Sequence, residues 1–225
     1  MKQDNDIKQE LQQRFDNGET IEFDTPTIVL GSASATRTKI LTDAGIEFVK
    51  IISSVDDNDI NYQHPHENVS KRALVQYIKK MALAKLDPFI GRIKNGAVIT
   101  ADTIAFYKGK ILEKPLTREK CREQHELLSG KTNYAYTAVA VHYNGKTLCK
   151  VMISKVCIRP LPECVLNKIC DEPATLHAAG YRIAGVIAPY VKIKNNAHRH
   201  NVMGLDPGMV RKMLASIGFK VLDRV

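Results

Sequence analysis

The stretch "GAVITADTIAFY", residues 96–107, predicts the central strand of the fold, because apolar and β-branched residues fill it. Its exception is Asp102, and a buried carboxylate is costly unless it is paired or holds a metal ion. The turn "KGK" (108–110) follows and predicts a hairpin that places Lys114 on the adjacent strand. Asp102 and Lys114 therefore form either a structural ion pair or part of a catalytic site, and these residues alone favour neither reading.

Outward from this strand, predicted helices and strands alternate, and a long hairpin with the turn "NG" (144–145) comes later. The expected strands cover residues 25–32, 47–53, 96–107, 132–143, 147–158 and 186–194. The expected helices cover residues 3–16, 34–44, 68–86, 118–128, 162–170 and 206–218. This order predicts an α/β fold with a mixed, twisted sheet and flanking helices. Residues 1–24 are expected to form a polar N-terminal extension, and residues 25–225 a single domain.

The composition is that of an ordinary globular protein, with 225 residues, 44% of them hydrophobic and 25% charged. The chain has no run of eighteen apolar residues, and its polar N-terminus resembles neither a secretory signal nor a transit peptide. We therefore expect no membrane partner and a cytoplasmic location. The five cysteines are odd in number and form no C-x-x-C pair, so they are interpreted as free thiols, and their spacing does not favour a zinc site.

The formal net charge of +9 suggests a polyanionic partner. Aromatic residues make up only 6% of the chain, tryptophan is absent, and no stacking pattern for nucleotide bases is present. Nucleic-acid binding therefore rests on charge alone and is the least favoured of the functions considered.

Two further segments carry residues suited to a phosphate ligand. In "VLGSASATR" (29–37), the small residues permit close approach of a ligand, the following helix N-terminus favours anions, and Arg37 offers a fork for phosphate oxygens. The alternative is that Ser32 or Ser34 only caps the helix. The acidic pair Asp56 and Asp57 follows the strand expected at 47–53, at the strand end where α/β folds place ligands, although solvated loop acids are the simpler interpretation.

Taken together, the segments resemble the Maf, or septum-formation-inhibitor, family of nucleoside triphosphate pyrophosphatases. The resemblance rests on motifs in the same order as in that family: "LGSASATRTKIL" (30–41), "SSVDD" (53–57), "TADT" (100–103), "EKP" (113–115), "LSG" (128–130), "LHAAGYRIAG" (176–185) and "VMGLD" (202–206). It extends over residues 27–219. It implies an elongated, two-lobed fold, similar to that of inosine triphosphatase, with a central cleft, and assembly as a homodimer.

The resemblance also implies an activity: hydrolysis of a nucleoside triphosphate between the α and β phosphates, with a divalent cation, Mg²⁺ or Mn²⁺. The implied catalytic residues are Asp102 as the general base, Asp57 and Lys114, and the implied metal ligands are Asp57 and Asp102. The implied substrate-binding residues are Ser32, Ser34, Arg37 and Thr103. "GYRIAG" resembles the branch that acts on thymidine and uridine triphosphates, which makes a pyrimidine or modified nucleotide the expected substrate.

Several positions depart from the family pattern. Thr36 stands where the family has an arginine, His177 where it has a lysine, and Ala184 where it has glutamine or glutamate. Lys39 and Arg182 are the two residues considered as replacements for the missing arginine. These departures motivate an alternative function, a nucleotide-binding protein of the same fold with weak catalysis.

Overall fold

The computed structural model describes residues 2–53, 55, 69–171, 183 and 185–221. Its centre is a seven-stranded mixed sheet in the order β2-β1-β3-β5-β6-β7, with β4 also paired to β3. The strands are β1 (Ile21–Leu30), β2 (Val49–Lys50), β3 (Ile93–Tyr107), β4 (Lys110–Leu112), β5 (Thr132–Tyr143), β6 (Lys146–Ile158) and β7 (Val191–Ile193). β1 runs parallel to β2 and β3, and the other pairs are antiparallel. The predicted α/β class with a mixed sheet is confirmed.

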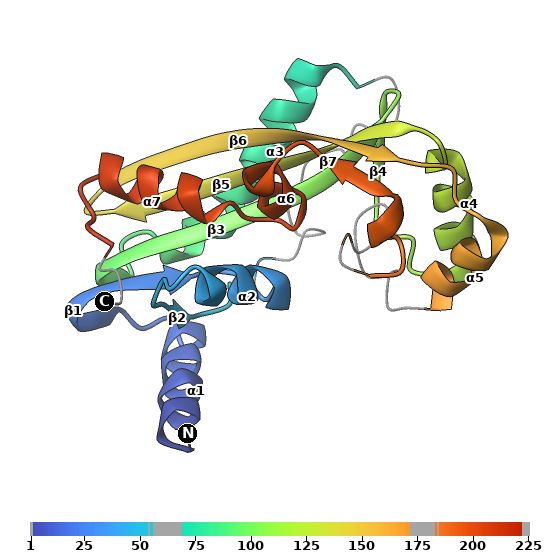
Figure 1. Ribbon diagram of the computed structural model, residues 1–225. Helices are drawn as coiled ribbons and strands as arrows, with labels where there is room; N and C mark the ends of the chain where they lie inside the picture. Colours follow the sequence, from blue (N-terminus) through green and yellow to red (C-terminus); the bar gives the residue numbers. More distant parts are fainter. Residues whose placement is uncertain (1, 54, 56–68, 172–182, 184, 222–225) are drawn as a thin grey trace.

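The helices pack on both faces of the sheet and at one end. They are α1 (Lys2–Asp16), α2 (Ala35–Asp43), α3 (Lys71–Leu86), α4 (Arg118–Leu128), α5 (Glu163–Asp171), α6 (Asn196–Val202) and α7 (Pro207–Ser216). Figure 1 shows β3, β5 and β6 running the length of the molecule, with β1 near one end and α4 and α5 at the other. The central cleft stays a prediction. In the described part of the chain, no helix is long and apolar enough to cross a membrane.

The apolar core follows this arrangement in three clusters. One joins α1 and α3 to β3 and β5, through residues such as Ile78 and Phe89. A second joins α2 and α7 to β1, β3 and β5, and includes Leu41 and Leu214. The third lies between α4, α5 and the strand ends near them. Burial on both faces explains why β3 is apolar along most of its length.

Two expected strands differ from those observed. The strand expected at 47–53 is reduced to Val49–Lys50. In the segment 186–194, the residues Ala188–Tyr190 form a 3₁₀ turn, and only Val191–Ile193 pair with β6. Pro189 explains the second difference, because proline lacks the N–H group that a strand would donate. The helix α6 was not predicted. Asn195 caps its start by accepting a hydrogen bond from the backbone N–H of His198, 2.9 Å away.

The N-terminal segment contributes to the core. β1 begins at Ile21, which pairs with Ile93, so the sheet starts inside the segment expected to be an extension. Phe15 at the end of α1 is only 3% exposed, and its ring stacks on Phe89 with 4.6 Å between ring centroids. The guanidinium of Arg92 lies 4.1 Å from the centroid of the Phe15 ring. The last turn of α1 is therefore anchored to the domain by an aromatic and cationic sandwich.

We expect Phe15→Ala to lower the free energy of unfolding by about 3–5 kcal/mol, because it removes a buried ring and leaves a cavity beside Phe89. Urea unfolding measures this loss. Ile7→Ala on the same helix is the matched control, since Ile7 is 52% exposed, and its effect should stay within about 0.5 kcal/mol. Equal effects of the two substitutions would show that α1 does not share the core.

Candidate functional site

The candidate site lies where β1 ends beside β3. The last paired residues of the two strands are Leu30 and Ile99, and β3 continues to Tyr107. On that same edge β4 pairs only from Ala105 onward, while β5 occupies the opposite edge. In the described part of the chain, residues 100–104 therefore pair with β5 alone. We call this stretch the 100–104 edge. The carboxyl end of β1 and the start of α2 lie next to this edge. Ligand sites in α/β folds are commonly found at the carboxyl ends of strands.

Gly31 makes the turn from β1 toward α2, and packing alone requires its small size. A Cβ atom at this position would lie 2.8 Å from Cγ2 of Thr100 and 2.9 Å from the ring of Phe89. Both distances are shorter than carbon atoms tolerate. The role of Gly31 in close approach of a ligand stays a prediction.

Ser32 and Ser34 organise the start of α2. Ser34 is the N-cap, and its Oγ accepts a hydrogen bond of 3.3 Å from the backbone N–H of Arg37. The Oγ of Ser32 accepts a 3.3 Å hydrogen bond from the backbone N–H of Ser34. The capping role weighed for these serines is thus confirmed for Ser34. Capping and a phosphate-binding role are compatible, because the positive end of the helix dipole stays at this turn.

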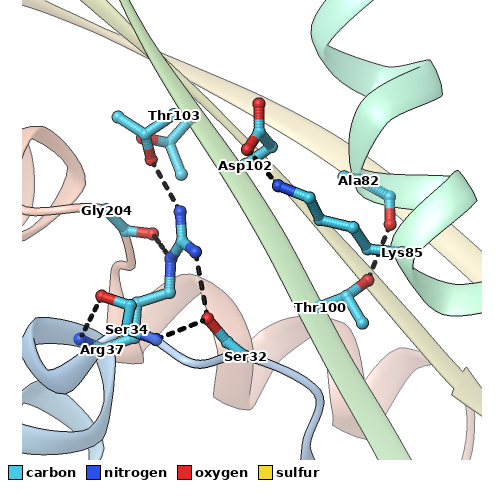
Figure 2. A network of polar contacts seen from close by, with 10 residues as sticks. Ser32, Ser34, Arg37, Ala82, Lys85, Thr100, Asp102, Thr103 and Gly204 are labelled. Atoms are coloured by element: carbon cyan, nitrogen blue, oxygen red, sulfur yellow. Dashed lines mark hydrogen bonds and ion pairs between the residues drawn. The ribbon is translucent and has the colours of Figure 1, made fainter. Parts of the chain in front are cut away.

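Arg37 ties three parts of the chain together (Figure 2). Its Nη1 donates to Oγ of Ser32 at 3.1 Å, and its Nη2 donates to Oγ1 of Thr103 at 3.2 Å. Its Nε donates to the carbonyl of Gly204 at 2.9 Å. Gly204 has φ +109, and an added Cβ would lie 3.3 Å from Nε, so only glycine suits this contact. Arg37, Ser32, Ser34 and Thr103, predicted separately, are therefore brought together in one network.

Asp102 forms an ion pair with Lys85 of α3, and Nζ of Lys85 lies 2.6 Å from Oδ1 of Asp102 (Figure 2). The two side chains are only 13% and 17% exposed, respectively. Two residues earlier on β3, Oγ1 of Thr100 donates to the carbonyl of Ala82 at 2.8 Å. Alternation along the strand sends Thr100 and Asp102 toward α3 and Thr103 toward Arg37. The 100–104 edge thus carries the carboxylate on one face and the arginine network on the other.

Lys85 was not identified from the sequence, although a signal for it exists. The buried face of α3 includes Ile78, Met81 and Ala82, and Lys85 follows these residues at seven, four and three positions. A lysine on an apolar stripe of a helix needs a partner, since an unpaired buried charge is costly. The same argument that singled out Asp102 in its strand would have selected Lys85 in its helix.

Lys114 does not pair with Asp102. The ladder between β3 and β4 ends at Ala105 and Leu112, and the side chain of Lys114 is exposed beyond it. The structural Asp102–Lys114 ion pair considered from the sequence is therefore wrong, because Lys85 takes that place. Asp57, His177, Arg182 and Ala184 lie outside the described residues. Lys39 forms an exposed ion pair with Asp43, 3.0 Å away, and its replacement of the arginine missing at Thr36 stays a prediction.

The residues at the edge of β3 fit a hard divalent cation to a limited extent. Asp102 supplies a carboxylate, which Mg²⁺ and Mn²⁺ prefer as a ligand. Among the described residues, no group of three potential ligands gathers around it. Mg²⁺ is usually held by one or two carboxylates together with substrate phosphates, so a single carboxylate is compatible with such a site.

Comparison with known proteins gives a consistent picture. The family model described as "Maf-like protein" matches residues 27–217. A dTTP/UTP pyrophosphatase of Neisseria gonorrhoeae is 29% identical over 195 residues, which covers 86% of this chain and 95% of that protein. A dTTP/UTP pyrophosphatase of Chlamydia caviae is 30% identical over 156 residues, covering 69% of this chain and 76% of that protein. One of Bacillus anthracis is 31% identical over 159 residues, covering 70% and 78%.

The ion pair of Lys85 and Asp102 should be measurable as an energetic coupling. Lys85→Met and Asp102→Asn are each expected to lower the free energy of unfolding by about 1.5–3 kcal/mol, because each leaves a largely buried polar partner without its counterpart. The double variant should lose less than the sum of the two losses. Urea unfolding of the three variants gives the coupling energy.

The control cycle uses Lys39→Met and Asp43→Asn, whose ion pair is exposed to solvent and should show a much smaller coupling. If the loss in the double variant equals the sum of the losses in Lys85→Met and Asp102→Asn, the result contradicts the pairing.

Proposed function

The chain belongs to the Maf-like protein family, and from this premise we propose that it is a nucleoside triphosphate pyrophosphatase. The match confirms the resemblance found in the sequence motifs. The proposed reaction hydrolyses the bond between the α and β phosphates and yields the nucleoside monophosphate and pyrophosphate. The observation that carries the proposal is the largely buried Asp102–Lys85 pair on the 100–104 edge, the same edge that carries Thr103 of the Arg37 network.

The relatives named dTTP/UTP pyrophosphatase make pyrimidine nucleoside triphosphates the first substrates to consider. These relatives are 29% and 30% identical to this chain. The proposed preference for pyrimidine bases therefore rests on the relatives' names. Support from the chain itself comes from the segment "GYRIAG" (180–185), which resembles the branch of the family that acts on thymidine and uridine triphosphates.

We assign the phosphates to the turn between β1 and α2. The first turn of α2 offers backbone N–H groups and the positive end of the helix dipole. Ser32, Ser34 and Thr103 add hydroxyl groups, and Arg37 adds a positive charge on the same side. Because Arg37 is held in place by Ser32, Thr103 and Gly204, its charge is oriented before any ligand arrives, which reduces the ordering cost of binding.

Asp102 is proposed to act as the general base. Its carboxylate would accept a proton from the attacking water, whose oxygen forms the new bond to the α phosphorus. The bond from that phosphorus to the bridging oxygen breaks, and its electron pair leaves with pyrophosphate. Lys85 balances the charge of Asp102 in the free protein, and its ammonium group can turn toward the anionic substrate, which would release a carboxylate oxygen for the water.

A divalent cation, Mg²⁺ or Mn²⁺, remains part of the proposal, with Asp102 and Asp57 as its protein ligands. When bound, it would neutralise phosphate charge and stabilise the charge that develops on the leaving group. Assembly as a homodimer and a cytoplasmic location also remain predictions.

One observation favours the alternative of a nucleotide-binding protein with weak catalysis. Arg37 donates from each of its three nitrogens to protein acceptors, and the neighbouring family arginine is Thr36 here. A triphosphate would have to share the guanidinium with these hydrogen bonds. Calorimetric binding of a triphosphate without turnover would favour this alternative.

Asp102→Asn should lower the rate of pyrophosphate release by about 10²–10⁴-fold, because an amide cannot accept the proton of water at neutral pH. The assay uses purified protein, UTP, dTTP and a panel of other canonical and modified triphosphates, each with Mg²⁺ and with Mn²⁺. Asp43→Asn, a carboxylate lost from the exposed face of α2, is the control and should keep full activity. Failure of the unaltered protein to release pyrophosphate from every triphosphate would overturn the proposed activity.

Lys114→Met tests whether the exposed lysine after β4 reaches the phosphates. We expect kcat/KM to fall by about 10–100-fold, since a charged contact to the transition state is lost. The free energy of unfolding should not change, because the side chain is exposed. Lys110→Met, an exposed lysine on β4, serves as the control. An unchanged kcat/KM would remove Lys114 from the site and leave Lys85 as the lysine next to Asp102.

A further inference from the structure

A second group of chemically reactive side chains lies far from the 100–104 edge, between α4 and α5 at the end of the sheet (Figure 1). Cys121 and His125 of α4 are fully buried, and Cys170 of α5 is 7% exposed. Each residue offers one ligand atom, and the three atoms all lie within 4.8 Å of one another. Cys121 and His125 are four residues apart, so one face of α4 presents both toward α5.

The ring of His125 lies close to Cys121. Its Nδ1 lies 2.7 Å from the backbone carbonyl of Cys121 and 3.6 Å from Sγ of the same residue. Since a carbonyl only accepts, Nδ1 carries the proton without a metal, and the lone pair of the ring lies on Nε2. A neutral imidazole with a backbone carbonyl as outer partner is a common form of a metal-ligating histidine.

The two cysteines are close enough to interact directly. Their Sγ atoms are two of the three ligand atoms that lie within 4.8 Å of one another. A dication bound by two thiolates and a neutral imidazole carries no net charge. This matters here, because the surroundings are apolar and include Leu128, Val165 and Ile169. Soft sulfur ligands select zinc-type ions over Mg²⁺ or Mn²⁺.

We propose that Cys121, His125 and Cys170 bind one Zn²⁺ ion that joins α4 to α5. Three protein ligands leave a fourth position for water or a small anion, as in open zinc sites. The helices are otherwise held at their surface by Arg122, which donates to Asn167 at 2.8 Å and to Glu163 at 2.7 Å. The zinc ion would add a second link between α4 and α5, in the buried interior between the two helices. The site is independent of the proposed pyrophosphatase reaction and of its cation.

The test starts with the full-length protein, reduced and freed of metal. Addition of Co²⁺ should produce the near-ultraviolet charge-transfer absorption of thiolate ligands, and Zn²⁺ should displace it at one equivalent per chain. Cys121→Ser and Cys170→Ser should each weaken Zn²⁺ affinity by at least about 100-fold, since loss of an outer partner alone costs about 10–100-fold. Cys164→Ser is the matched control, because Cys164 lies on α5 but is exposed, and its affinity should equal that of the unaltered protein.

The unaltered protein keeps the test decisive even if a variant fails to fold. Its melting temperature should rise with Zn²⁺ concentration and fall back when a chelator is added, as linkage requires. Thiolate absorption distinguishes metal binding at this site from metal binding at Asp102, where the described residues offer only oxygen ligands. Absence of that absorption in the unaltered protein, equal Zn²⁺ affinity in Cys170→Ser, or equal loss in Cys164→Ser would each overturn the proposal.

Discussion

The unpaired edge of β3 is the constraint on which the candidate site depends. β1 stops at Leu30 because the chain must turn into α2, and β4 is too short to cover more than Ala105–Tyr107. Among the described residues, only β5 pairs with residues 100–104. A strand that is anchored on one edge and open on the other can hold Asp102 and Thr103 rigidly while leaving both within reach of a ligand. Because side chains alternate along a strand, Asp102 points to one face of the sheet and Thr103 to the other.

Much of the fold could be predicted from the sequence, because local residue patterns determine several strands and turns. Hydrophobic alternation identified β3, β5 and β6, and the turn at Asn144 and Gly145 fixed the long hairpin. The cost of a buried carboxylate singled out Asp102 without any knowledge of its neighbours. The prediction failed where a side chain pairs with a residue on another element of the fold. Asp102 pairs with Lys85, seventeen residues earlier, and not with the lysine that a hairpin appeared to bring near.

Other differences have the same origin. α1 carries one aromatic residue, Phe15, whose ring packs against Phe89 and Arg92. Phe89 also crowds the turn after β1, since Phe89 and Thr100 occupy the space where a side chain at position 31 would go. Packing between distant segments therefore requires the small size of Gly31. Neither link is visible in local composition, because each joins segments that are distant in sequence.

The two proposed metal sites differ in ligand type as well as in position. At Asp102 the described residues offer carboxylate oxygens beside a lysine, a setting that suits hard cations shared with phosphates. Between α4 and α5 the donors are sulfur and imidazole in an apolar cluster, where only a charge-neutral complex is tolerated. A hard cation gains little from sulfur ligands, whereas a zinc-type ion that displaces the thiol protons gains two strong ligands. The two proposed sites would therefore select different ions, an exchangeable cation for phosphate chemistry at Asp102 and a zinc-type ion between α4 and α5.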